Sequence, residues 1–275
     1  MSAALMEGLI GMAAKTTPFA APGPVVRGVS PPISNAPLRA PTEAEAAEWA
    51  ANGVVCLRQV IPPEWTEYLR ACLDDIFERD SVSSKGLRTD MTQAAAAQAR
   101  LGAEVLLDGG AALGESGSFL TEIDCWWHEG LRHFELSSPL PQVVAAALSS
   151  DRLRFYQDHL FKKEAGANIR TGFHQDRPYF CWAGEQIAVC WCSPTAVTAE
   201  MGAMCYVKGS HRWAEHKPTL LVSNTPTHDH PGPALPDIDG NPADYEVLTF
   251  ETQPGDIIIH HANTVHGSRG NTDPR

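Results

Sequence analysis

The chain has 275 residues, of which 21 are Lys or Arg and 33 are Asp or Glu, so its formal net charge is −12. This acidic balance disfavours nucleic acid and anionic membranes as partners, because both bind basic surfaces. A hydrophobic content of 43% is ordinary for a globular protein, and no run approaches the roughly 20 apolar residues of a membrane-spanning helix. The short apolar runs at the N-terminus do not support a secretory signal, so we expect a cytoplasmic protein.

The sequence contains 7 cysteines and no C-x-x-C pair. This spacing disfavours a zinc knuckle. Buried, reduced thiols are the better interpretation for a cytosolic chain.

Residues 1–40 are rich in Pro, Ala, Gly and Ser. Because proline removes backbone donors and fixes φ, we expect this segment to be disordered or to lie over the surface, before a domain spanning 41–275. That domain begins with a predicted helix. Thr42 can cap it, Glu45 completes a capping box, and Gly53 ends it.

The first part of the domain, about 41–150, is predicted to be mainly helical. A short β-branched strand over 54–61 interrupts it, and apolar residues at helical spacing follow in PPEWTEYLRACLDDIFERD. The further helices are predicted over 62–80, 91–107 and 139–149.

After about residue 150 the chain changes to short strand-like runs between Gly, Pro and Asn turns. This pattern favours an all-β sandwich or barrel over a parallel α/β sheet, so we expect a β-core over 151–275. The predicted strands lie within 153–164, 185–195, 202–210, 245–250 and 255–268.

The stretch TGFHQDRPYF places His174 and Asp176 two positions apart. On a strand these side chains would share a face. An imidazole and a carboxylate make two-thirds of the facial triad that holds non-haem Fe(II) and leaves positions open for substrate and O₂. An H-x-D pair also occurs by chance at solvated strand ends, and these two residues alone leave that alternative open.

The stretch PGDIIIHHANTVHGS offers His260, His261 and His266 as a third ligand. His266 precedes Gly267 and Ser268, where a buried strand would turn, and this favours it as the ligand. For His260 and His261 we favour a role in packing, or in hydrogen bonding to the ligands.

Several segments in order resemble one family: FYQDHLFKKEAG, FHQD, a strand ending at Trp191, GAMCYVKGSHR and GDIIIHHANTVHGS. The chain resembles the phytanoyl-CoA dioxygenase-like branch of the Fe(II)/2-oxoglutarate oxygenases, and KGSH, Lys208–His211, is similar to that family's PGSH turn. The resemblance covers about 45–275. It implies an α+β, mainly β fold, with a double-stranded β-helix (a jelly-roll, cupin-like core) and N-terminal flanking helices.

The resemblance implies that His174, Asp176 and His266 bind the iron. Halogenating relatives replace the carboxylate so that chloride can bind, and its presence here implies a hydroxylase or related oxidase. The distal carboxylate of 2-oxoglutarate needs a cation, which in the family is an arginine shortly after the last histidine. Arg275 is the candidate, unless the true clamp lies beyond a truncated C-terminus; Arg269 is expected to face solvent in a turn.

Other positions match the family's cosubstrate pocket. Ser268 and Trp191 match residues that line it, although Trp191 would also suit plain core packing. By strand parity, Lys162 and Asp158 share the face that points inward in relatives, although Lys162 would also suit a strand end where its stem snorkels.

Three residues beside the H-x-D pair complete the expected site. Gln175 points away from the metal by parity, and it remains a candidate donor to the ligands. Tyr179 and Phe180 follow closely enough to wall the substrate space.

The resemblance implies an enzyme that uses Fe(II), 2-oxoglutarate and O₂. It would hydroxylate an unactivated C–H of a small-molecule substrate while 2-oxoglutarate decarboxylates to succinate and CO₂. Two alternatives remain: an inactive jelly-roll binding protein, and a zinc hydrolase with the same triad. A monomer and a homodimer are both compatible with the sequence.

Overall fold

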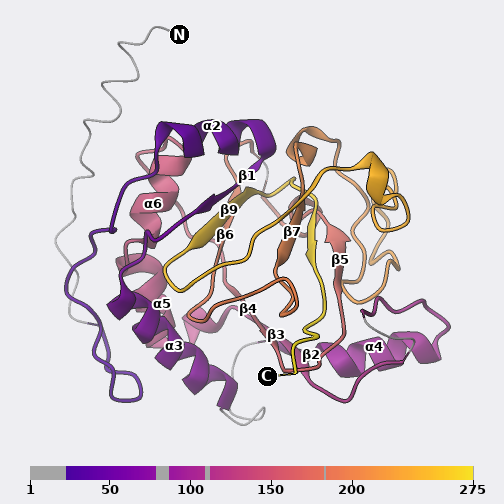
Figure 1. Cartoon of the computed structure of the whole chain (residues 1–275), viewed down its shortest axis with the longest axis horizontal. Helices are drawn as coiled ribbons and strands as arrows, with labels where there is room; N and C mark the ends of the chain where they lie inside the picture. The colour runs from indigo at the N-terminus through magenta and orange to yellow at the C-terminus, as the bar shows by residue number, and fades with distance from the viewer. Residues whose placement is uncertain (1–22, 79–86, 109–111, 183, 275) are drawn as a thin grey trace, which may run out of the picture.

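The computed structural model describes residues 23–78, 87–108, 112–182 and 184–274. Within them the strands form three antiparallel sheets, with the neighbour orders β1–β9–β6, β5–β10–β7–β8 and β2–β3–β4 (Figure 1). The first two sheets combine strands that are far apart in the sequence. The bounds are β1 Val54–Leu57, β2 Leu87–Asp90, β3 Ser118–Glu122, β4 His159–Lys163, β5 Thr171–His174, β6 Ala188–Cys192, β7 Met204–Val207, β8 Val247–Thr249, β9 Ile257–His261 and β10 His266–Ser268.

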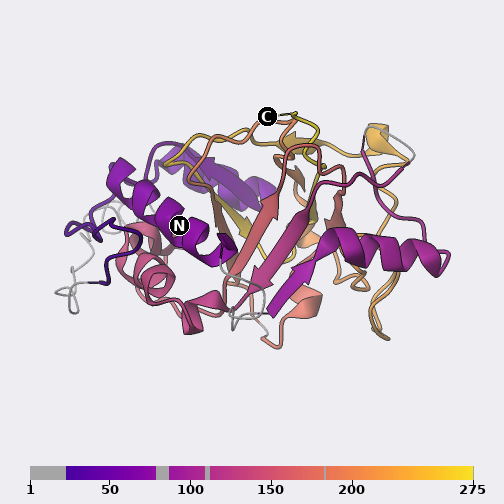
Figure 2. The ribbon, with the colours of Figure 1, turned by 90° about the horizontal axis from the view of Figure 1, so that it is seen from below.

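Most of the helices cover one side of the β1–β9–β6 sheet, while α4 lies apart beside β2 and β3 (Figures 1 and 2). The fold is therefore a mixture of α and β structure, as the sequence predicted at that coarse level. The helices are α2 Glu43–Asn52, α3 Pro63–Glu78, α4 Met91–Arg100, α5 Glu129–Ser137 and α6 Leu140–Ala147.

Helix α2 begins and ends where its sequence predicts. The Thr42 hydroxyl accepts from the Glu45 backbone N–H at 3.2 Å, and the Glu45 carboxylate accepts from the Thr42 N–H at 2.7 Å. Gly53 then adopts φ 75°, a left-handed conformation that only glycine takes readily. The capping box and the glycine stop are confirmed.

Strand β9 is buried on both faces, which explains its continuous apolar sequence. Ile257 and Ile259 pack into the cluster that includes Trp65 of α3. Ile258 faces the opposite way, against Tyr206 of β7. By the same alternation, His260 lies on the inner face with Ile258, away from the helices.

Several predicted elements are shorter than expected. The strand predicted over 54–61 ends at Leu57, because Gln59 adopts φ 50° and the N–H groups of Val60 and Ile61 both donate to the Gly255 carbonyl. The helix predicted over 91–107 ends at Arg100, since Gly102 adopts φ 84° just beyond it.

One broader expectation was wrong. The segment 255–268, predicted as a single strand, forms β9 and β10 in different sheets, because the chain turns between them. The described residues of 41–150 form the helices α2 to α6 and also the strands β2 and β3, which were not predicted. Strand β1 pairs with β9 from the far end of the chain. The central β structure is therefore built from both halves of the sequence.

The N-terminal segment was predicted to be disordered or to lie over the surface. Residues 1–22 of it lie outside the described residues. From Pro24 onward the segment runs along α3: the Tyr68 hydroxyl donates to the Pro24 carbonyl at 2.7 Å, and the Trp65 indole N–H donates to the Ser34 carbonyl at 2.7 Å.

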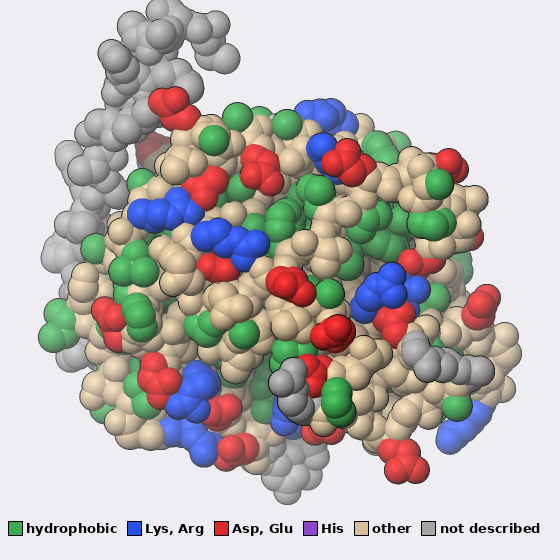
Figure 3. Space-filling model, in the orientation of Figure 1, with side chains coloured by type: hydrophobic (Ala, Val, Ile, Leu, Met, Phe, Trp, Pro, Cys, Tyr) green, Lys and Arg blue, Asp and Glu red, His purple; other side chains and the backbone are tan. Residues whose placement is uncertain are grey.

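The surface agrees with the composition of the chain. On the face seen in Figure 3, acidic and basic side chains are interspersed. In the part of the chain that the structure describes, no helix has the length and apolar character needed to cross a bilayer. All seven cysteines are free thiols; Cys181 is exposed, contrary to the expectation of burial.

Candidate metal centre

Three side chains that the sequence singled out converge in the second sheet. His174 ends β5, His266 begins β10, and the two residues lie opposite each other in the strand pairing. The Nε2 atom of His174 lies 3.5 Å from Oδ1 of Asp176, and Nε2 of His266 lies 3.6 Å from Oδ2 of Asp176. One ligand atom from each residue lies within 4.8 Å of the others, so the three could hold one metal ion.

Asp176 reaches the site by a different route from the one predicted. Strand β5 ends at His174, and Asp176 has helical backbone angles, φ −73° and ψ −34°. It opens a short 3₁₀ turn, Arg177–Tyr179, in which proline favours the turn. The chain therefore bends toward the metal position after one ligand, and strand alternation does not bring the pair together.

Backbone carbonyls fix the protonation of both imidazole ligands. Nδ1 of His174 lies 2.8 Å from the Gly172 carbonyl, and Nδ1 of His266 lies 2.9 Å from the Thr264 carbonyl. A carbonyl only accepts hydrogen bonds, so each Nδ1 carries the proton and each Nε2 keeps a lone pair. Both lone pairs are then free for a metal beside Asp176.

The charges of the site suit a cation. Burial lowers the pKa of His266 to about 3, so this imidazole is neutral at physiological pH. Burial by itself would raise the pKa of Asp176, but the three imidazoles around its carboxyl hold that pKa well below its usual range. The centre thus offers the Nε2 atoms of two imidazoles and one carboxylate.

The neighbouring histidines of β9 divide between the two faces of the sheet. His260 is buried, and its Nε2 lies 3.0 Å from Oδ2 of Asp176. His261 faces the other way: its Nε2 donates to the Glu185 carbonyl at 3.0 Å, and its Nδ1 accepts from the Asn263 N–H at 3.0 Å. Of these two histidines, His260 therefore contacts Asp176 and His266.

Lys163, next to the predicted Lys162, contacts Ser268 and Arg269, which follow His266 in the chain. Lys163 Nζ donates to the Ser268 hydroxyl at 2.7 Å and to the Arg269 carbonyl at 2.6 Å. Burial lowers the pKa of this ammonium to about 7. Lys162 points to the opposite face, where its Nζ lies 5.9 Å from the Phe77 ring and 3.9 Å from the Glu164 carboxylate.

The parity of β4 explains this exchange. Leu160 packs against the helix-side core, so Lys162 shares that face, while Lys163 lies on the opposite face with His159 and Phe161.

Asp158 and Gln175 hold backbone segments instead of facing the metal position. The Asp158 carboxylate accepts from the N–H groups of Asp124 and Cys125, each at 2.9 Å. The Gln175 amide donates to the carbonyls of Ala214 and Asn263 and accepts from the His216 N–H.

A second group of metal-binding side chains surrounds Asp158, together with Cys125 and Glu135. Burial raises the pKa of Glu135 to about 9, so this carboxyl is neutral at physiological pH. A neutral carboxyl and a neutral thiol beside a satisfied carboxylate are a weak set of donors for a cation.

The remaining predicted residues surround the centre at greater distance. Trp191 pairs with Ile258 and packs with it against Tyr206. The Tyr179 ring stands edge-on to His174, with centroids 5.9 Å apart, and its hydroxyl donates to the Thr219 carbonyl. Phe180 packs edge-on against Tyr156 at 5.2 Å.

The arginine candidates divide. Arg275 lies outside the described residues. The side chain of Arg269 is 64% exposed, with Nη1 3.6 Å from the Asp108 carboxylate, as expected of a residue that faces solvent.

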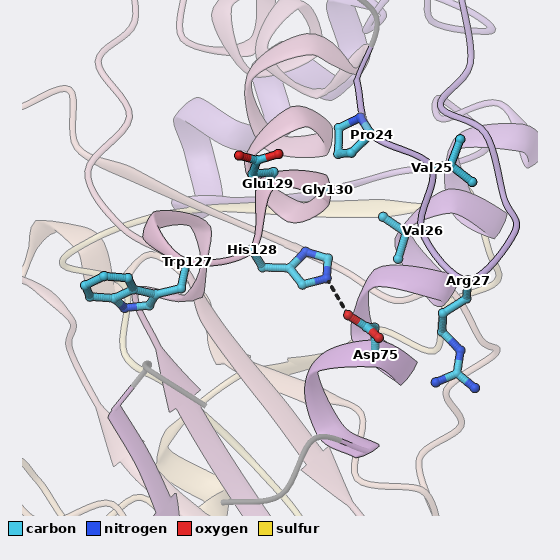
Figure 4. A pocket seen from close by; sticks show the side chains of 9 residues that line it. All are labelled: Pro24, Val25, Val26, Arg27, Asp75, Trp127, His128, Glu129 and Gly130. Atoms are coloured by element: carbon cyan, nitrogen blue, oxygen red, sulfur yellow. Dashed lines mark hydrogen bonds and ion pairs between the residues drawn. The ribbon is translucent and has the colours of Figure 1, made fainter. Parts of the chain in front are cut away.

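A separate hollow lies where the N-terminal segment meets α3 and α5 (Figure 4). There His128 points toward Asp75, with Nε2 3.2 Å from Oδ2. Residues 24–27 and 127–130 form the rest of its lining, so this hollow contains none of the three converging residues.

Comparison with solved structures gives the same fold at low sequence identity. The carbocyclase SnoK from nogalamycin biosynthesis, described as non-heme and alpha ketoglutarate dependent, has a TM-score of 0.59 and 18% identity over 86% of this chain and 80% of its own. The epimerase SnoN, solved with Fe³⁺, alpha ketoglutarate and nogalamycin RO, has a TM-score of 0.58 and 17% identity over 85% of this chain and 78% of its own. EvdO2 from Micromonospora carbonacea var. aurantiaca, complexed with 2-oxoglutarate, has a TM-score of 0.55 and 17% identity over 86% of this chain and 87% of its own.

The family model described as "Phytanoyl-CoA dioxygenase (PhyH)" matches residues 49–275, which include His174, Asp176 and His266. This match covers most of the chain and includes every strand described above. The chain therefore belongs to the phytanoyl-CoA dioxygenase (PhyH) family.

Proposed function

We propose that this protein is a non-haem Fe(II)/2-oxoglutarate-dependent oxygenase that hydroxylates an unactivated C–H of a small molecule. The observation that carries the proposal is the convergence of two imidazole Nε2 lone pairs and one carboxylate, from His174, His266 and Asp176. Three protein ligands leave the remaining positions of an octahedral iron open, as this chemistry requires. Family membership favours iron over zinc, which would accept the same donors.

We further propose that the two larger sheets form a double-stranded β-helix. In support, β9 and β10 follow each other in the chain yet belong to different sheets, as a jelly roll requires when its strands cross from one sheet to the other. The carboxylate of Asp176 and the imidazole of His260 meet where these sheets face each other.

The cosubstrate site is proposed beside Ser268. Lys163 brings an ammonium to the Ser268 hydroxyl, in a position to pair with a carboxylate of 2-oxoglutarate. Arg275 remains a second proposed cation for that carboxylate, with Trp191 as part of the pocket wall. Lys162, Asp158 and Gln175 are not proposed as cosubstrate ligands, because each of them contacts other groups of the protein.

The substrate is proposed to enter past an aromatic rim. Tyr156, Tyr179 and Trp182 are 38%, 38% and 56% exposed, and Phe180 packs against Tyr156 among them. Tyr179 is the member in contact with His174. Aromatic walls at this position would orient a small molecule over the centre and keep water from it.

When bound, Fe(II) with 2-oxoglutarate and O₂ supplies the oxidising power for hydroxylation, with succinate and CO₂ as coproducts. The protein's own groups would hold the metal through Nε2 of His174 and His266 and the carboxylate of Asp176, and Lys163 would supply a cation to the cosubstrate. These tasks need no proton transfer from the two imidazole ligands, whose Nδ1–H groups donate to backbone carbonyls.

Anaerobic addition of Fe(II) and 2-oxoglutarate tests the proposal. A 2-oxo acid chelated to Fe(II) gives a visible charge-transfer absorption, which we expect for the wild-type protein and not for His266→Ala. Absorption that needs only Fe(II), or that survives in His266→Ala, would contradict the assigned centre. A centre that binds Zn(II) but does not bind Fe(II) together with 2-oxoglutarate would favour the zinc hydrolase alternative.

A further inference from the structure

We propose that His260 is a positioning residue for Asp176: it is not a metal ligand, and its Nε2–H holds one carboxylate oxygen so that the other is presented to the metal. This inference rests on the proposed function only for the identity of the metal. It concerns a third imidazole, whose ring centroid lies 4.3 Å from that of His266.

The protonation of His260 is opposite to that of the two ligands. Its Nδ1 is buried and has no hydrogen-bond partner among the described residues, so no carbonyl draws a proton to that nitrogen. Its Nε2 lies 3.0 Å from Oδ2 of Asp176, and a carboxylate oxygen is the acceptor of such a hydrogen bond. The Nε2 atom must carry the proton, and a nitrogen that carries a proton is not available to a metal.

His260 is also held in a fixed position. It lies in β9, paired on one side with Val54 of β1 and on the other with Val189 of β6. Its ring is 2% exposed and packs against Tyr206, with centroids 5.2 Å apart. The Nε2–H of His260 therefore has a fixed position relative to the β1–β9–β6 sheet.

Asp176, in contrast, lies at the start of a short turn, and its side chain caps none of the backbone N–H groups there. Its orientation depends on what its two oxygens meet. Oδ2 meets His260 at 3.0 Å and lies 3.6 Å from Nε2 of His266, while Oδ1 lies 3.5 Å from Nε2 of His174. Because the hydrogen bond to His260 occupies Oδ2, Oδ1 is the oxygen that would bind the metal.

The protonation state can be read directly in the wild-type protein. Long-range ¹H–¹⁵N correlation of the imidazoles, without metal and with Zn(II) alone, should show Nε2–H for His260 in both states. The same spectra should show Nδ1–H for His174 and His266, with their Nε2 signals shifted by Zn(II). Loss of the His260 Nε2 proton on addition of Zn(II) would make His260 a ligand and overturn the proposal.

Variants test the positioning role. His260→Gln keeps a side-chain N–H donor, and His260→Leu removes it; His261→Leu is the matched control on the other face. With Co(II) as the probe, we expect His260→Leu to weaken metal affinity about 10- to 100-fold, and His260→Gln and His261→Leu to stay within about threefold of wild type. Equal affinity of the Leu variant and wild type would overturn the proposal, as would equal losses in the Leu and Gln variants.

The tests of His260 can succeed or fail independently of the proposed oxygenase function. The NMR and Co(II) measurements need neither 2-oxoglutarate nor turnover, so they stand if the protein proves to be another kind of metalloprotein. Should His260→Leu fail to fold, the wild-type spectra and the Gln variant still decide between donor and ligand.

Discussion

The three histidines of the centre differ in their chemistry because their ring nitrogens meet different partners. In His174 and His266 a backbone carbonyl accepts from Nδ1–H, which leaves Nε2 to bind a metal. In His260 the Asp176 carboxylate lies at Nε2, which makes this nitrogen a hydrogen-bond donor. At this scale the ammonium of Lys163 also lies beside Ser268, and this contact supports the proposal that it pairs with the cosubstrate.

The lowered pKa of Lys163 predicts how cosubstrate affinity depends on pH. Burial brings that pKa to about 7, so the ammonium is fully charged below this pH and lost above it. We expect the apparent affinity for 2-oxoglutarate to be highest below pH 7 and to fall by up to about tenfold between pH 6 and 8, measured by anaerobic titration of the Fe(II) protein.

Replacement of the lysine tests the same contact. Lys163→Met should weaken 2-oxoglutarate binding at least tenfold and remove this pH dependence, because a charge-assisted pair is lost. Lys162→Met is the matched control and should change neither the affinity for 2-oxoglutarate nor its pH dependence. A pH profile that persists in Lys163→Met would assign it to another group.

At the scale of elements, the centre depends on how closely β10 approaches β5. A Cβ added at Gly267 would lie 2.7 Å from the Thr171 carbonyl oxygen and 3.2 Å from backbone atoms of Gly172 and Phe173. Neither backbone can move without breaking the pairing that sets His266 opposite His174.

Gly267→Ala should therefore separate the two strands and misplace one ligand. We expect Co(II) affinity to fall at least tenfold, and the free energy of unfolding to fall by about 1–3 kcal/mol, which urea denaturation would measure. Unchanged metal affinity in this variant would mean that the β5–β10 contact does not position the centre.

The turn into β9 is held by another carboxylate. Asp256 is buried and accepts from the N–H groups of Gln59 and Gln253, at 2.9 and 3.0 Å, and from the Arg58 guanidinium at 2.8 Å. Burial alone would raise its pKa, but these donors lower it. This network ties the start of β9 to the end of β1.

A lowered carboxyl pKa fixes the sign of the pH effect. The contribution of Asp256 to stability is present above the ordinary carboxyl pKa and is lost as pH falls through the lower pKa of the folded state. Asp256→Asn should cost about 2–3 kcal/mol at pH 7, with a smaller cost in acid. The exposed Asp244→Asn is the control and should change stability by no more than about 0.5 kcal/mol.

At the scale of the whole molecule, the centre joins two sheets. His174 and His266 come from the β5–β10–β7–β8 sheet, and the hydrogen bond from His260 connects Asp176 to the β1–β9–β6 sheet. A metal bound by the folded state and not by the unfolded chain stabilises the whole domain.

Metal binding should therefore raise the melting temperature. At a free metal concentration about 100 times the Kd, the gain is about 2.7 kcal/mol, which for a domain of this size corresponds to a shift of about 5–10 °C. Calorimetry with Co(II) should show this shift for wild type and not for Asp176→Ala. An equal shift in the variant would place the stabilising metal elsewhere.

The sequence predicted those features that depend on local chemistry. Neighbouring residues predicted the capping box of α2 and the apolar strand β9. The H-x-D motif and the later histidine were recognised from their order along the chain. It did not predict that Asp176 lies beyond its strand, because the turn depends on how β5 meets β10. It missed β2 and β3, whose short, partly polar sequences become strands by pairing with each other and, for β3, with β4.

The most direct test of the central claim is succinate formation from 2-oxoglutarate by the anaerobically Fe(II)-loaded protein after exposure to O₂, for wild type and Asp176→Ala. We predict succinate that depends on both Fe(II) and O₂ for wild type, and none above background for the variant. No succinate from folded, iron-loaded wild type, or an equal amount from Asp176→Ala, would contradict an oxygenase built on His174, Asp176 and His266.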